Sequence, residues 1–177
     1  MRLSIVHTWD GQPVDHMEHV HWRLVLEPEH LRVKVDAQRF GDPLPDHPAG
    51  STPRLWEHEV VELFLLGPES ERRAYTEIEL GPHGHHLVLR LEGVRQPVER
   101  LLPMDYEVER RGQRWWGRAS IDRSLLPDPI VAFNAYAIHG VGDRRRYLAH
   151  AAVPGESPDF HRLEYARSWH PRKVSTQ

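Results

Sequence analysis

Cysteine is absent from the 177-residue sequence. This absence removes thiol nucleophiles and thiolate metal ligands from the possible chemistry, and it is compatible with either redox environment. The chain also lacks any apolar stretch near the ~20 residues that a membrane span requires, so no membrane partner is expected. Its N-terminus has too short an apolar segment for a signal peptide and no small-residue cleavage site, which predicts a cytoplasmic protein.

Charge of one sign is not in large excess either. The 23 Lys and Arg and the 26 Asp and Glu give a formal net charge of -3. No long-range attraction to nucleic acid or to an anionic membrane is therefore expected. The short arginine runs at 110–111 and 144–146 are typical of a solvated surface, and a nucleic-acid partner is not predicted.

Helix signals are scarce, and short alternating runs of apolar and polar residues dominate the chain. This period of two indicates strands, and the expected strands cover 20–26, 31–36, 55–65, 75–80, 87–91, 106–110, 115–121, 130–139 and 146–151. One helical turn is expected between Asp122 and Pro127. The sequence predicts an all-β fold, a two-sheet antiparallel β-sandwich, as a single domain over 1–177 with a frayed tail at 170–177.

The runs 55–65 and 75–80 are expected to pair as a hairpin around the turn-rich segment 67–73. If they pair, their apolar sides coincide and face the interior of the sandwich. The residues predicted to form this part of the core are Val61, Leu63, Leu65, Ile78, Leu80, Leu87 and Leu89.

The opposite side of the same hairpin combines aromatic rings with carboxylates. With a period of two, Trp56 shares a side with Glu62, and Tyr75 shares a side with Glu77 and Glu79. A solvated outer face normally mixes Lys, Arg, Thr and Glu, whereas this one contains no Lys. We therefore predict that this polar face binds a ligand, and that at least one of the clustered carboxyls has a raised pKa through like-charge repulsion.

Ordinary structural roles remain alternatives for the same residues. The glutamates are also consistent with a solvent face whose charges are neutralised by Arg90 or Arg118. Trp56 is also consistent with a core aromatic that seals one end of the sandwich. The proline-rich segment 41–53 leads directly into Trp56, and we expect it to wall one side of the acidic face.

Four segments in order, 55–65, 75–84, 133–136 and 158–161, resemble the DOMON-like superfamily. Within it, the likeness is greatest to the family 9 carbohydrate-binding modules and their uncharacterised bacterial relatives. The resemblance covers most of the chain from residue 55 onward. It implies a jelly-roll type of sandwich whose concave sheet holds a sugar, often by its reducing end, against aromatic rings and hydrogen-bonding side chains.

Individual ligand positions follow from this resemblance. Trp56 falls where the family has a stacking tryptophan, and Glu62 where it has a hydroxyl-binding residue. Glu79 and His83 lie near two further polar positions. Where the family has a second stacking tryptophan, this chain has the segment 159–161. The phenylalanine of this segment would stack less extensively than a tryptophan. The ligand-binding residues expected for a small saccharide or polyol-like ligand are Trp56, Glu62, Glu77, Glu79, His83, Phe160 and His161.

Other classes of protein stay open. Paired carboxylates act in glycoside hydrolysis when they flank the scissile bond, at about 5 Å or about 6.5–9.5 Å apart, but the three glutamates would share one open face. No catalytic residue is therefore assigned. A protein-interaction domain using the same face is a further alternative. A haem-binding domain of the DOMON type is another alternative, although Met17 and Met104 match no haem-ligand pattern. The sequence makes no prediction of the oligomeric state.

The 14 histidines invite a metal interpretation. Two groups lie close in sequence, at 16–21 and 83–86, but neither has the helical His-x-x-x-His spacing with a clear acidic partner. Neither a metal site nor a cofactor is predicted.

Overall fold

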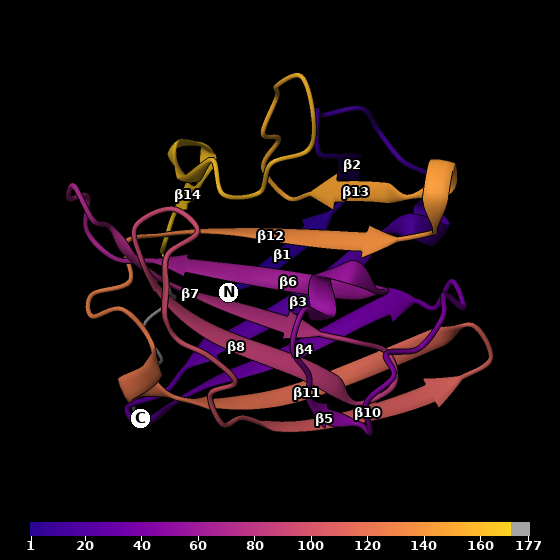
Figure 1. Ribbon diagram of the computed structural model, residues 1–177, viewed down its shortest axis with the longest axis horizontal. Helices are drawn as coiled ribbons and strands as arrows, with labels where there is room; N and C mark the ends of the chain where they lie inside the picture. The colour runs from indigo at the N-terminus through magenta and orange to yellow at the C-terminus, as the bar shows by residue number, and fades with distance from the viewer. Residues whose placement is uncertain (171–177) are drawn as a thin grey trace.

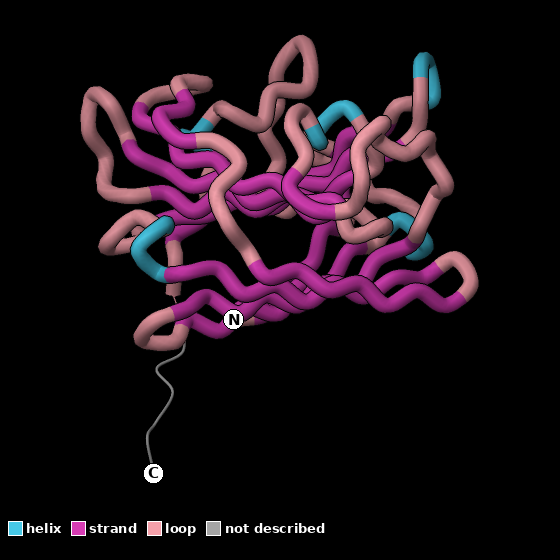
Figure 2. The backbone as a smooth tube through the Cα atoms, turned by 60° about the horizontal axis from the view of Figure 1, so that its bottom comes forward, coloured by secondary structure: helices cyan, strands magenta, loops and turns pink. Residues whose placement is uncertain are grey.

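The structure, a computed structural model, describes residues 1–170, and within this range two β-sheets stack face to face (Figures 1 and 2). The five-stranded sheet has the strand order β1-β3-β4-β11-β10, and the nine-stranded sheet has the order β2-β13-β12-β6-β7-β8-β5, with β14 beside β12 and β9 beside β8. All pairs are antiparallel except β5 with β8. The predicted β-sandwich is confirmed. The predicted frayed tail, 170–177, lies outside the described residues apart from His170.

The strands of the five-stranded sheet are β1 (Arg2–Ile5), β3 (Val20–Leu26), β4 (His30–Gln38), β10 (Asp105–Arg111) and β11 (Arg114–Asp122). Those of the other sheet are β2 (His7–Thr8), β5 (Gly50–Ser51), β6 (Val60–Leu66), β7 (Ala74–Leu80), β8 (His85–Glu92), β9 (Pro97–Glu99), β12 (Ala132–His139), β13 (Arg146–Ala149) and β14 (Arg167–Ser168). Short 3-10 helices are η1 (His16–Glu18), η2 (Leu55–Glu57), η3 (Arg123–Leu125), η4 (Gly142–Arg144) and η5 (Leu163–Tyr165). The predicted helical turn is η3, with Asp122 as its N-cap.

Apolar side chains fill the space between the two sheets. Strands β6 and β7 contribute Val61, Leu63, Leu65, Ile78 and Leu80, as the alternation predicts. The placement of Leu87 and Leu89 in this core is wrong, because they lie opposite Glu79 and Glu77 in the β7–β8 register and so share the outer face with them. Val88 points into the core instead. Strand β8 is buried on both sides around Val88, because the sheet is covered on both faces, so its more apolar side is not the inner one.

A second apolar cluster covers the outer face of the nine-stranded sheet. It combines Phe64, Tyr75 and Tyr136 from the strands with Phe160 and Leu163 from the C-terminal part of the chain. The hydroxyl of Tyr136 donates to the backbone oxygen of Phe160 at 3.0 Å, which ties this late segment to strand β12. Both faces of the sheet are therefore buried around its centre, and the outer one carries the candidate site.

Trp56 does not lie on a strand, contrary to the prediction of a strand over 55–65. Arg54 has a left-handed backbone with φ of 57°, which interrupts the extended chain. The N–H of His58 then bonds to the carbonyl of Leu55 and closes the turn η2. Strand β6 begins only at Val60. The tryptophan consequently projects from a turn above the sheet rather than from the sheet itself.

Candidate functional site

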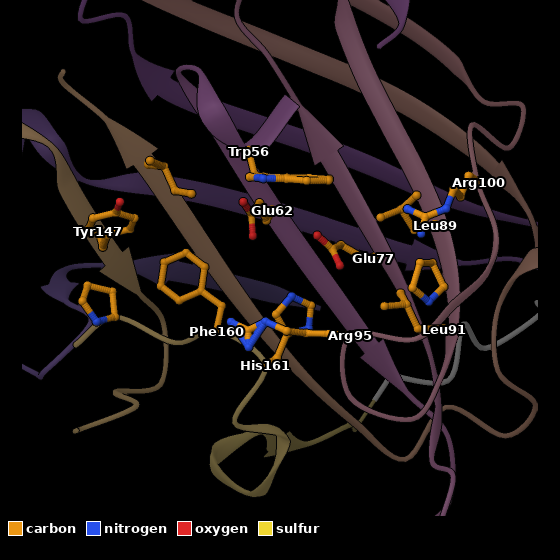
Figure 3. A pocket seen from close by; sticks show the side chains of 13 residues that line it. Trp56, Glu62, Glu77, Leu89, Leu91, Arg95, Arg100, Tyr147, Phe160 and His161 are labelled. Carbon is orange, nitrogen blue, oxygen red and sulfur yellow. The ribbon is translucent and has the colours of Figure 1, made fainter. Parts of the chain in front are cut away.

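A cavity of about 390 Å³ opens over the outer face of strands β6, β7 and β8 (Figure 3). We call it the Trp56 pocket. Glu62 and Glu77 form its floor, and Trp56 lies on one side of them, with Phe160 and His161 on the other. Further lining residues are Leu89, Leu91, Arg95, Pro97, Arg100, Ile138, Tyr147 and Pro158.

The three predicted carboxyls are neighbours in the sheet. Glu62 of β6 lies directly opposite Glu79 of β7, and Glu77 follows on the same face of β7. Their exposed fractions are only 2%, 4% and 0% for Glu62, Glu77 and Glu79. Glu62 and Glu77 line the pocket, whereas Glu79 is fully buried and does not. The cluster is therefore part of the protein interior, not a solvated surface.

Burial is the main cause of the raised pKa values of this cluster, which lie well above the usual range for Glu62 and Glu79 and at about 7 for Glu77. Mutual repulsion contributes less, so the sequence prediction of raised pKa values named the smaller cause. The nearby cations are also different from those expected. Arg145 lowers the pKa of Glu62, and Arg95 lowers that of Glu77.

The cations suggested by the sequence lie elsewhere. Arg90 pairs with Glu99 of β9, and Arg118 lies on β11 of the other sheet. Sequence reasoning missed Arg95 because it sits in the β8–β9 connection, with φ of 56°. It missed Arg145 because that residue belongs to an arginine run interpreted as solvated. No local pattern indicated that either residue approaches the glutamates.

The carboxyls of the cluster have unused capacity to accept hydrogen bonds. Glu77 and Glu79 lie close enough that their interaction lowers the pKa of Glu77 and raises that of Glu79. No hydrogen bond of ordinary geometry joins them, and in residues 1–170 one oxygen of Glu62 and both of Glu79 are buried without any such partner. The backbone N–H of Trp56 lowers the pKa of Glu79 but falls short of that geometry.

The wall opposite Trp56 is built from stacked rings. Phe160 lies parallel to Tyr136, with ring centroids 4.0 Å apart and an interplanar angle of 8°. The rings of Tyr147 and Phe160 are nearly perpendicular, at a centroid distance of 6.1 Å. One face of Phe160 is therefore occupied by a protein ring, and the residue is only 8% exposed. It shapes the wall of the pocket more than it offers a free ring for stacking.

His161 is held in place by Tyr75. The Tyr75 hydroxyl accepts a hydrogen bond from the backbone N–H of Arg95 at 3.1 Å and lies 2.8 Å from Nδ1 of His161. The hydrogen bond between Tyr75 and Nδ1 fixes the orientation of the imidazole ring at the edge of the pocket. Burial, with the charge of Arg95, lowers the pKa of His161 to about 4, so the ring is neutral at pH 7.

Trp56 is half-buried and fixed through its backbone. Its carbonyl accepts a hydrogen bond from Nη2 of Arg145 at 2.6 Å, and Nη1 of the same arginine donates to the carbonyl of Gly140 at 3.2 Å. The indole lines the pocket and also packs against the outer apolar cluster. The tryptophan therefore keeps a partly open ring beside the carboxyls.

His83 does not line the Trp56 pocket. It lies in the turn between β7 and β8, where it contacts Arg110, and burial together with that arginine lowers its pKa. The segment 41–53 is also placed differently from the prediction. Its residues Asp42 to Pro45 line a small hollow with His83. The C-terminal segment around Phe160, not 41–53, provides the wall of the acidic site.

Over residues 1–170, no group of three or more His, Cys, Asp or Glu side chains is arranged to hold a metal ion. Among the helices in the same residues, none combines the length and apolar character needed to cross a membrane. Met17 is exposed, and Met104 packs against the core between the sheets.

Two solved structures share this fold. One is a protein from Bacteroides uniformis with a suggested role in carbohydrate binding. Its TM-score with this chain is 0.68 at 17% sequence identity, and the match covers 95% of this chain and 84% of the Bacteroides chain. The other is a family 9 carbohydrate-binding module from Caldicellulosiruptor kristjanssonii in complex with glucose, with a TM-score of 0.50 and 11% identity over 89% and 79% of the two chains. These similarities confirm the predicted sandwich architecture.

The sequence matches no family model, but it has clear relatives among vertebrate proteins. It is 42% identical over 173 residues to the UPF0462 protein C4orf33 homolog of Mus musculus, covering 93% of this chain and 88% of that protein. It is 40% identical over 177 residues to UPF0462 protein C4orf33 of Homo sapiens, covering 96% and 87%. These relatives do not support the expected likeness to specifically bacterial proteins. The chain belongs to the UPF0462 family typified by C4orf33.

Proposed function

We propose that this protein binds a small saccharide, or a similar polyol, in the Trp56 pocket without transforming it. The observation that carries the proposal is the pair of nearly fully buried carboxyls, Glu62 and Glu77, on the floor of an aromatic-walled cavity. Within residues 1–170, no N–H group forms a hydrogen bond of ordinary geometry with either carboxyl. A bound ligand with several hydroxyl groups would supply the missing partners.

The chemistry of the pocket suits such a ligand. Each sugar hydroxyl both donates and accepts hydrogen bonds, so it can pair with an ionised carboxylate as well as with a protonated carboxyl. That versatility matters because burial brings the pKa of Glu77 to about 7. The apolar C–H face of a sugar ring needs an aromatic surface, which Trp56 offers. The volume of about 390 Å³ falls in the range of small-ligand sites.

Support from other proteins is limited to architecture. The family 9 module with a similar fold was solved in complex with glucose, which makes a hexose the natural first ligand to test. The relation to the wider DOMON-like superfamily and the cytoplasmic location stay predictions. So do the roles of the individual ligand-binding residues.

Isothermal titration calorimetry with a panel of mono- and disaccharides tests the proposal. We expect a Kd between about 10 µM and about 1 mM, because each hydroxyl gives up water when it binds. Trp56→Ala should remove most of the affinity. Glu62→Gln should weaken binding about fivefold, the equivalent of about 1 kcal/mol. A loss of this size is typical of a hydrogen bond between neutral groups, and burial favours the neutral form of the Glu62 carboxyl.

Trp116→Ala is the matched control, because Trp116 is another half-buried tryptophan but lies on the other sheet. It should leave saccharide affinity unchanged. The proposal fails if no sugar binds at millimolar concentration, or if Trp56→Ala binds as well as the wild type. Release of product from an oligosaccharide, abolished by Glu77→Gln, would instead favour a glycoside-processing enzyme.

A further inference from the structure

A row of four basic side chains crosses the outer face of the five-stranded sheet. In the strand register, Arg2 of β1 lies opposite Arg23 of β3, Arg23 opposite Lys34 of β4, and Lys34 opposite Arg118 of β11. All four are exposed. We call them the basic row. Because neighbouring strands lie about 4.8 Å apart, the basic row extends over about 14 Å.

Like charges directly opposite one another in a sheet are destabilising, so such a row normally contains acidic partners. Among residues 1–170, none of the four side chains forms an ion pair or a side-chain hydrogen bond. Their neighbours on the same face behave differently: Arg32 pairs with Glu27 at 3.2 Å, and Arg114 pairs with Asp36. The residues 171–177 contain no Asp or Glu that would neutralise the row.

The basic row borders a hollow that is open to solvent. This hollow has a volume of about 320 Å³ and is lined by the four cations together with His21 and Trp116. Asp36 also lines it, with its carboxylate paired to Arg114. Trp116 is half-buried, so part of its ring is available. Figure 2 shows that the described loops gather over the nine-stranded sheet, while none of them crosses the outer side of the five-stranded one. A ligand can therefore reach the row directly.

We propose that the basic row binds a small molecule that carries two or more phosphate groups. Arginine guanidinium groups pair with phosphate oxygens in a bidentate geometry, and a lysine adds a point charge to the same anion. A single phosphate reaches one or two of the cations, whereas linked phosphates reach across the row. Trp116 offers an aromatic surface for the part of the ligand that is not phosphate.

A compact ligand fits this face better than a nucleic-acid strand or a membrane. Strand β10 borders the row with Asp105, Glu107 and Glu109, and Glu107 lies directly opposite Arg118. A long polyanion that continued past Arg118 would meet these carboxylates. The net charge of -3 also provides no long-range attraction to a large polyanion. The row lies on the other sheet from the Trp56 pocket, so this proposal is independent of saccharide binding.

Calorimetric titration with inorganic tripolyphosphate and with orthophosphate at low salt tests the proposal. Tripolyphosphate should bind at least tenfold more tightly than orthophosphate, and its affinity should fall as salt is raised. The double variant Lys34→Gln/Arg118→Gln should weaken tripolyphosphate binding at least tenfold. The matched control Arg144→Gln/Arg167→Gln removes two exposed arginines elsewhere and should leave the affinity unchanged.

Thermal unfolding provides a second readout that also shows whether each variant is folded. Tripolyphosphate should raise the Tm of the wild type and not that of the Lys34→Gln/Arg118→Gln variant. The proposal is overturned if that variant binds tripolyphosphate as well as the wild type, or if orthophosphate binds equally well. Tighter binding of a single-stranded oligonucleotide or of anionic vesicles than of tripolyphosphate would also overturn it, in favour of a macromolecular partner.

Discussion

Replacing Glu77 by glutamine should change how the stability of the protein depends on pH. Glu77 is 4% exposed, and burial raises its pKa from 4.5 to about 7, against the opposing effects of Glu79 and Arg95. The folded state therefore holds a proton on this carboxyl over a pH range in which the unfolded chain has already lost it. Glutamine has nearly the same shape but never ionises.

The sign and size of the effect follow from proton linkage. Between pH 4.5 and about 7, the folded protein binds more protons at Glu77 than the unfolded chain does, so the free energy of unfolding falls as pH rises. A full shift of this size is worth about 3 kcal/mol, at about 1.4 kcal/mol per pH unit. Coupling to Glu62 and Glu79 spreads the transition, which makes this value an upper limit.

Urea unfolding from pH 4.5 to 8.5 measures the difference between Glu77→Gln and the wild type. The two proteins should be similarly stable near pH 4.5, and the variant should become the more stable by up to about 3 kcal/mol above pH 7. Glu69→Gln is the control, because the Glu69 side chain is 89% exposed. Parallel stability curves for Glu77→Gln and the wild type would refute the assignment of a buried, protonated cluster.

Three further substitutions test other parts of the structure. Gly117→Ala should destabilise by about 1–3 kcal/mol in urea unfolding, because its Cβ would lie 2.7 Å from a methyl group of Val35. Glu59→Ala should accelerate proteolysis of the segment 40–42, whose three backbone N–H groups donate to this carboxylate. Asn134→Ala should lower the free energy of unfolding by about 2–3 kcal/mol, since its side chain makes two buried hydrogen bonds to the backbone of Ala151.

Local sequence patterns determined the class of fold. Side chains alternate between the two faces of a strand, so a period of two showed which residues share a face without reference to the rest of the chain. This reasoning paired the strands around 67–73 correctly and grouped Glu62, Glu77 and Glu79 on one face. The grouping of carboxyls with aromatic rings was enough to indicate a candidate site. It did not indicate that the site is enclosed.

The tertiary structure decided which groups surround those carboxyls and which protonation state they favour. Phe160 and His161 reach the site through contacts with Tyr136 and Tyr75, from which they are separated by 24 and 86 positions in sequence. Alternation also predicted the wrong inner side for β8, because this sheet is buried on both faces and the more apolar side of a strand need not be the inner one. The pKa of a carboxyl depends on how much water its surroundings exclude. In this protein, segments that lie far apart in the sequence exclude water from the carboxyls. The pKa values of these carboxyls therefore depend on the tertiary structure.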